Sequence, residues 1–221
     1  MRLRILKGPL RGYKWIVGAA AGEAKGLSII LNLSEQEQIK IAKEIISKNN
    51  VCFDVGANVG LYSLLFSRYS KLVYAFEPLP RNLSFLYKTI EINQIRNVII
   101  VPCAVADKNK LSWFQVGKNY SLGRLTTKGN QPVMVLSLDN FIKESLVVPD
   151  IIKIDVEGSE LSVLRGSKNL LSESKPIILL STHGDKVKKE CLDFLKQLNY
   201  KILKPLDTDS IEKATEFLIK P

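Results

Sequence analysis

"FDVGANVG", residues 53 to 60, decides the fold, because it joins the end of an apolar run to the start of a helical pattern. Gly56 and Gly60 permit a tight turn at this point, and Leu61 and Leu64 begin a helix behind it. In an open α/β sheet, ligands bind at the carboxyl ends of the strands, and the loop after the first strand is the usual place. We therefore expect this turn to bind a ligand.

The rest of the chain alternates short β-branched runs with helical patterns, which is typical of a parallel sheet covered on both faces. The expected strands are residues 51–55, 71–76, 97–105, 150–156, 176–182, 200–203 and 215–219. A convincing crossover helix is missing between the last two runs, so these two strands should pair antiparallel. The sequence predicts an α/β, Rossmann-like fold whose mostly parallel sheet has one antiparallel strand near the C-terminus.

Residues 34–48 precede the first strand and have a helical pattern. Ser34 and Glu37 are spaced as a capping box, and Ile41 and Ala42 belong to an apolar stripe. We expect this helix to pack on the sheet.

Residues 117–132 interrupt the alternation with a long polar segment between two short strand-like runs, 110–116 and 133–136. Loops of this length in a compact domain tend to be functional or disordered. Three polar side chains could contact a substrate there, with a solvated loop as the alternative: Tyr120, Ser121 and Arg124.

The composition, with 221 residues of which 46% are hydrophobic and 24% charged, indicates one globular core. The net charge of +10 is spread along the chain with one modest cluster at residues 186–189, which favours a solvated basic surface over a nucleic-acid groove. No uninterrupted apolar stretch follows the basic N-terminus, so we predict no signal peptide, no membrane span and a cytoplasmic location. The cysteines Cys52, Cys103 and Cys191 lack metal-type spacing and are expected in the core.

The carboxylate of Asp54 distinguishes between two classes of nucleotide ligand. The turn has the spacing G-x-x-x-G instead of the dinucleotide fingerprint G-x-G-x-x-G, and a carboxylate two residues before the first glycine would repel a pyrophosphate. S-adenosylmethionine (SAM) presents an ammonium and a sulfonium instead, so Asp54 favours SAM over NAD. Glu77, 21 residues after Gly56, could accept ribose hydroxyls in either ligand. Helix capping by Asp54 and a surface position for Glu77 are the structural alternatives.

Four segments occur in an order and at intervals that resemble the FkbM family of SAM-dependent methyltransferases: "FDVGANVGLYSLLFS", "VYAFEPLPRN", "SLDNFI" and "DIIKIDVEGSELSVLRGS". The resemblance covers roughly residues 50–183. It implies a Rossmann-like class I methyltransferase fold and, most often, methyl transfer to a hydroxyl of a sugar or another natural product. We assign residues 50–221 to the SAM-dependent methyltransferase domain and residues 1–49 to an N-terminal extension with strands and a packing helix.

The resemblance also implies roles for individual residues in cofactor binding. The methionine part of SAM would be lined by Asp54, Gly56, Asn58 and Gly60, and the ribose by Glu77. Asp107, just beyond the third strand, could approach the adenine or cap a turn.

The segment "KIDVEG", residues 153–158, is the favoured source of the chemistry, because it ends the fourth strand with two carboxylates. Asp155 and Glu157 would point to the same side if the strand continues. Methylation of an oxygen requires that the hydroxyl lose its proton, so either residue could act as general base or as ligand of a divalent metal. Helix capping and pairing with Lys153 are the structural alternatives.

His183, the only histidine, follows the fifth strand and could act as base or metal ligand. A structural role is the alternative. The family frequently carries an acidic residue near this position, whereas this chain has Ser181 and Thr182, so the resemblance assigns neither a base nor a metal site.

We predict a SAM-dependent O-methyltransferase acting on a small hydroxylated acceptor. One alternative keeps the cofactor and makes RNA or protein the acceptor, because of the +10 charge. Another is a SAM-binding module without turnover. A divalent metal is allowed by the residues but not required, and the sequence predicts no oligomeric state.

Overall fold

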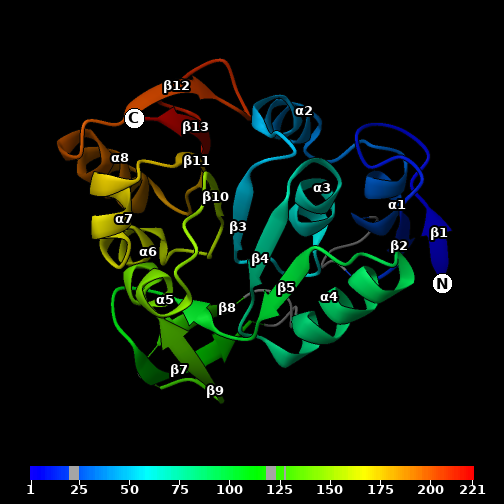
Figure 1. Cartoon of the computed structure of the whole chain (residues 1–221), viewed down its shortest axis with the longest axis horizontal. Coiled ribbons are helices and arrows are strands. Elements are labelled where there is room, and N and C mark those ends of the chain that lie inside the picture. The colour runs from blue at the N-terminus through cyan, green and yellow to red at the C-terminus, as the bar shows by residue number, and fades with distance from the viewer. Residues whose placement is uncertain (20–24, 118–122, 127) are drawn as a thin grey trace.

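The computed structural model describes residues 1–19, 25–117, 123–126 and 128–221. Its centre is a seven-stranded sheet within these residues, with the order β12-β13-β11-β10-β3-β4-β5 (Figure 1). In that order the strands are β12 (Lys201–Pro205), β13 (Glu216–Lys220), β11 (Ile177–Ser181), β10 (Ile151–Ile154), β3 (Val51–Val55), β4 (Leu72–Phe76) and β5 (Val98–Val101).

The direction of the strands confirms the predicted topology. Strands β10, β11, β3, β4 and β5 pair in parallel, whereas β13 runs antiparallel to both of its neighbours, β11 and β12. The chain proceeds from β3 through β4 to β5 in one direction and then returns to the other side of β3 with β10. Strand order therefore reverses between β3 and β10, the place where open α/β sheets bind ligands.

Helices cover both faces of the sheet, and each face has its own apolar core (Figure 1). One face carries α2 (Gln36–Ile45), α3 (Leu61–Tyr69) and α4 (Pro80–Ile92). The other carries α5 (Leu138–Ser145), α6 (Glu160–Arg165), α7 (Lys168–Glu173) and α8 (Asp185–Gln197). Successive residues of a strand alternate between faces, so Cys52 packs in the first core and Phe53 in the second.

A second sheet, which the sequence revealed only in part, lies beside the carboxyl edge of the first. Its order is β6-β9-β7-β8, with β6 (Ala104–Val105), β9 (Gln131–Leu136), β7 (Lys110–Val116) and β8 (Gly123–Thr126). The predicted single strand over residues 97–105 was wrong, because β5 ends at Val101 and Ala104 pairs in the second sheet. The polar segment 117–132 is also not a simple loop, because β8 within it pairs antiparallel with β7.

The N-terminal residues form a hairpin and two helices that pack on the α3 face. The strands are β1 (Arg2–Arg4) and β2 (Lys14–Ile16), and α1 (Lys25–Ile30) follows. Trp15 is fully buried in the same core as residues of α3. The N-terminal extension therefore shares the core of the main sheet.

The capping box predicted for α2 was wrong. The N-cap is Glu35, in a left-handed conformation with φ of 52° and without a side-chain cap. Ser34 Oγ instead donates to Ser28 Oγ at 2.6 Å. The apolar stripe was correct, because Ile41 and Ala42 are buried.

Two smaller expectations have clear outcomes within the described residues. Cys52, Cys103 and Cys191 are buried free thiols, as predicted. Among the described helices, none is both long and apolar enough to cross a lipid bilayer.

Candidate active site

Two cavities open at the carboxyl edge of the main sheet and share four lining residues. The first is lined by Glu77, Leu79 and Asn82 after β4, and by Phe114 and Leu125 of the second sheet. The second is lined by Asp54, Tyr62 and Lys153, together with Trp15 and Glu35 from the N-terminal part. The shared residues are Gly56, Asn58, Asp155 and Glu157. Most of the sequence-predicted site residues therefore meet at one junction.

Gly56 brings the β3 and β10 ends of the site together. It has a φ of +84°, and a Cβ atom added there would lie 1.9 Å from the Asp155 carbonyl oxygen. Its backbone N–H and that of Ala57 donate to the Phe76 carbonyl at 3.0 and 2.9 Å. From the sequence we expected a ligand to approach the backbone of Gly56 closely. In the structure the backbone of Asp155 occupies the space that a side chain would fill.

Glu77 is a buried carboxylate at the end of β4, 4% exposed. It accepts hydrogen bonds from the backbone N–H groups of Asn58 and Leu79, each at 2.9 Å, and from Asn82 Nδ2 at 3.2 Å. Burial nevertheless raises the pKa of Glu77 to about 7. An ionised carboxylate has about four acceptor sites, so capacity remains on the cavity side for a hydroxyl donor.

Asp54 is also buried, 2% exposed, and lies on the α3 face of β3. Ser63 Oγ donates to Asp54 Oδ2 at 2.6 Å, so the first turn of α3 holds the carboxylate. Burial raises the pKa of Asp54 to about 6, although Ser63 and the nearby Lys153 oppose the shift. Asp54 therefore adds an acidic wall to the second cavity.

Asn58 carries an acceptor with unused capacity at the junction. Its φ of 50° is left-handed, and its Oδ1 atom is buried without a hydrogen-bond partner in the described part of the chain. A buried carbonyl oxygen normally has a donor. SAM offers an ammonium and ribose hydroxyls, so a SAM molecule across the two cavities would supply the missing donor.

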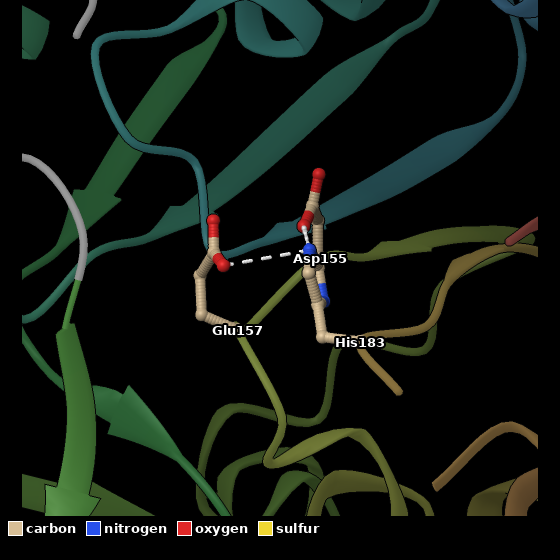
Figure 2. Close-up of side chains that lie close together, drawn as sticks. All are labelled: Asp155, Glu157 and His183. Atoms are coloured by element: carbon tan, nitrogen blue, oxygen red, sulfur yellow. Dashed lines mark ion pairs between the residues drawn. The ribbon is translucent and has the colours of Figure 1, made fainter. Parts of the chain in front are cut away.

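Asp155, Glu157 and His183 form a cluster at the carboxyl ends of β10 and β11 (Figure 2). His183 Nε2 lies 3.7 Å from Asp155 Oδ1 and 3.5 Å from Glu157 Oε2. The side chains are 37 to 38% exposed, so solvent and ligands can reach them. The structure thus brings together the three predicted catalytic residues.

The backbone reaches this arrangement in a way that differs from the expectation. β10 ends at Ile154, so Asp155 and Glu157 do not share a strand face. Glu157 has a left-handed φ of 54°, and Gly158 follows with 95°. This turn, rather than strand alternation, directs both carboxylates toward His183.

Glu160, the first residue of α6, is a member of the cluster that sequence reasoning missed. Its side chain is fully buried, and its Oε1 atom lies 2.8 Å from His183 Nδ1 and accepts from Gly158 N–H at 2.9 Å. The hydrogen bond to Glu160, with smaller contributions from Glu157 and Asp155, raises the pKa of His183 to about 9 against the effect of burial. The sequence shows that Glu160 is an acidic residue near the end of β10, but it does not show that the side chain is buried.

Lys153 pairs with Asp155, as the structural alternative for the two carboxylates predicted. Its side chain is buried, and Nζ lies 3.3 Å from Asp155 Oδ2 and hydrogen bonds to Ser181 Oγ. Burial opposes ionisation of Asp155, but Lys153 and His183 outweigh burial and lower the pKa of Asp155. The two oxygens of Asp155 therefore face two different basic groups.

Gly60, the N-cap of α3, is not among the described residues that line the cavities, and Asp107 is the other predicted cofactor residue that the structure does not bring to the junction. The described residues that line the two cavities do not include it, and its side chain is exposed. Ser162 Oγ donates to Asp107 Oδ1 at 3.2 Å. Of the polar residues expected to contact an acceptor, Tyr120, Ser121 and the Arg124 side chain lie outside the described part of the chain.

The sheet order, the reversed strand and the ligand edge at the β3–β10 switch define a class: the SAM-dependent methyltransferases of Rossmann-like fold. Solved structures of similar fold include a methyltransferase FkbM from Methylobacillus flagellatus KT, with a TM-score of 0.59 and 18% identity. The alignment covers 92% of this chain and 56% of that one, so this chain spans a little over half of that structure's length. Aeropyrum pernix fibrillarin with natively bound SAM aligns with a TM-score of 0.52 and 11% identity, covering 83% and 73% of the two chains.

Sequence comparison identifies the family within that class. The profile of the methyltransferase FkbM domain matches residues 54–202, and the chain belongs to this family. The hexuronic acid methyltransferase AglP of Haloferax volcanii is 26% identical over 166 residues, which cover 74% of this chain and 68% of AglP. Methyltransferase 1 of Beauveria bassiana is 25% identical over 140 residues, 51% of this chain and 56% of the relative.

Proposed function

We propose that this chain methylates a hydroxyl group of a sugar or another small natural product. The observation that carries the proposal is the shared wall of the two cavities, because Asp155 and Glu157 line both. A cofactor that extends from the first cavity to Asp54 in the second, and an acceptor in the rest of the second cavity, would meet beside the acidic cluster. The similarity to a hexuronic acid methyltransferase supports a sugar as the acceptor.

In this proposal the buried carboxylates hold SAM. Glu77 accepts a hydrogen bond from a ribose hydroxyl. Asn58 Oδ1 accepts a hydrogen bond from the ammonium group, and the Asp54 carboxylate attracts its charge. Gly56 and Gly60 shape the turn. When bound, SAM supplies an electrophilic methyl group on its sulfonium. Asp107 as an adenine contact and the cytoplasmic location stay predictions; three buried free thiols are consistent with a reducing compartment.

In this proposal the residues of the cluster act on the acceptor. Positioning the hydroxyl oxygen in line with the methyl group contributes most, because the leaving group is already good. The hydroxyl proton passes to a carboxylate of the cluster, Asp155 or Glu157, as the new carbon–oxygen bond forms and the methyl–sulfur bond breaks. His183, whose pKa is about 9, is already protonated near neutral pH and stabilises these carboxylates. The N-terminal residues Trp15 and Glu35 contribute the far wall of the acceptor cavity.

Two measurements test the proposal. Calorimetric titration with SAM, S-adenosylhomocysteine and NAD should give binding of the two adenosyl ligands only, and Asp54→Ala should weaken it while circular dichroism remains unchanged. Mass spectrometry of reactions with hexuronates, neutral sugars and RNA should then detect a methylated sugar. Methylation of RNA alone would reassign the acceptor, and SAM binding without any product would indicate a module without turnover.

A further inference from the structure

We propose that Asp155, Glu157 and His183 bind a divalent metal ion through Asp155 Oδ1, Glu157 Oε2 and His183 Nε2. Its use, holding the oxygen atoms of the acceptor at the junction of the cavities, rests on the function proposed above. Binding of the ion itself does not.

The separations of the donor atoms match a common ion. The ligand atoms of the three residues lie within 4.8 Å of one another, with 3.5 and 3.7 Å between the imidazole nitrogen and the two carboxylate oxygens. Ligands about 2.1 Å from one ion lie about 3 Å apart in an octahedral site and about 3.4 Å apart in a tetrahedral one. Small side-chain rotations would therefore bring all three atoms into coordination.

Glu160 provides an independent observation that points to a metal. It engages His183 Nδ1 from a fully buried position, and the Gly158 N–H fixes the same carboxylate oxygen. The Nδ1–H therefore donates to Glu160, while Nε2 faces the cluster, where a metal ion would take the place of its proton (Figure 2). Histidines that bind metals almost always donate their other N–H to a carboxylate or carbonyl in this way.

The second oxygen of Glu160 strengthens this reading. Glu160 Oε2 is buried without a hydrogen-bond partner among the described residues. An ionised carboxylate in such a place is strongly disfavoured unless a nearby positive charge compensates it. His183 can supply at most one positive charge to the carboxylates around it, whereas a divalent ion would supply two.

The charges around the cluster also favour a cation. Asp155, Glu157 and Glu160 bring three carboxylates together, and the ammonium of Lys153 contacts Asp155 through Oδ2. Asp155 Oδ1 therefore faces His183 rather than the lysine. A set of one imidazole and two carboxylates suits Mn²⁺, Fe²⁺, Co²⁺ or Zn²⁺ better than it suits Ca²⁺ or Mg²⁺, which typically bind oxygen ligands only.

Titration of chelator-treated protein with Mn²⁺ tests the proposal in the absence of SAM and acceptor. Electron paramagnetic resonance reports the free Mn²⁺ and should give one bound ion per chain. His183→Ala and Glu157→Gln should each weaken binding at least tenfold, and Glu160→Gln by about 10- to 100-fold, the usual effect of changing a group behind a ligand. Asp185→Asn is the matched control, because it removes an exposed carboxylate two residues from His183, and its affinity should equal that of the wild type.

The outcomes separate this proposal from the function. Absence of Mn²⁺ binding, or binding that survives His183→Ala, overturns the metal site even if SAM binds and methyl transfer occurs. Binding of one ion with the predicted variant effects supports the site even if no acceptor is methylated. Because the buried Glu160→Gln change could impair folding, the half-exposed His183 and Glu157 variants carry the decision, with circular dichroism as the check.

Discussion

The two ends of the site treat their carboxylates in opposite ways. At the cofactor end, Asp54 and Glu77 are buried and their partners are neutral donors, so burial raises their pKa values to about 6 and about 7. At the cluster end, Asp155 is half-exposed, and Lys153 and His183 lower its pKa. The difference indicates that burial dominates at the cofactor end, even with Lys153 near Asp54, and leaves carboxylates that the ammonium and hydroxyl donors of SAM would stabilise. The second end concentrates charge for binding a cation and handling a proton.

The largest expected effect is on stability, from a substitution at Gly56, where the β3 and β10 ends of the site approach each other. Gly56→Ala would place a Cβ atom 1.9 Å from the Asp155 carbonyl oxygen and force alanine to a φ of +84°. Backbone, unlike a flexible side chain, cannot move aside, so we expect a loss of about 3 kcal/mol or more in the free energy of unfolding. Urea denaturation measures this loss.

The matched control is Gly158→Ala, where φ is +95° but no atom lies within 4 Å of the added Cβ. Strain alone should cost about 1 kcal/mol there. Equal effects of the two substitutions would contradict the idea that close approach of the β3 and β10 ends requires Gly56.

Glu77→Gln tests whether the cofactor end and the cluster bind their ligands independently. The amide keeps the size of the side chain but loses the charge that strengthens hydrogen bonds from ribose hydroxyls, so SAM affinity should fall about 30-fold, which is about 2 kcal/mol. Calorimetry measures the affinity for SAM. Mn²⁺ affinity should be unchanged, and a parallel loss of both would mean that the two ends are one coupled site.

The pH dependence of SAM binding should also originate at the cofactor end. The carboxylate form of Glu77 accepts hydroxyl donors, and its pKa in the free protein is about 7. Lowering the pH through this value protonates Glu77, so affinity should fall about tenfold from about pH 8 to about pH 6. Most of this dependence should vanish in Glu77→Gln. Equal slopes in wild type and variant would assign the titration to another group.

Much of the fold and of the cofactor end could be predicted because the relevant signals are local. The run at residues 51–55 is a strand with the predicted bounds, and its buried position on both faces explains why every residue except Asp54 is apolar. Asp54, Gly56 and Asn58 lie within five residues of one another in the sequence, and Glu77 directly follows the next strand. Parallel strands bring such ends to one edge, so their convergence follows from the topology.

The missing parts depend on contacts between distant segments. Glu160 reads as an ordinary acidic residue in the first turn of a helix, and only the packing of His183, 23 residues later, gives it a partner. β8 lies in a polar segment and exists because β7 pairs with it. Glu35 is the N-cap of α2, and Ser34 donates a hydrogen bond to Ser28 instead of capping the helix. Local patterns do not encode these choices.

The smallest expected effect concerns Asp107, which the family resemblance brought near the adenine. The residue is exposed, its Oδ1 accepts from Ser162, and it is not among the described residues that line either cavity. Asp107→Asn retains an oxygen that can accept from Ser162, so stability should change by no more than about 0.5 kcal/mol. SAM affinity measured by calorimetry should change less than about twofold, since surface changes of this kind are nearly neutral. A loss of about tenfold would instead mean that bound SAM extends from Glu77 past β6 to the Asp107 carboxylate, and the cofactor end would then be larger than the first cavity.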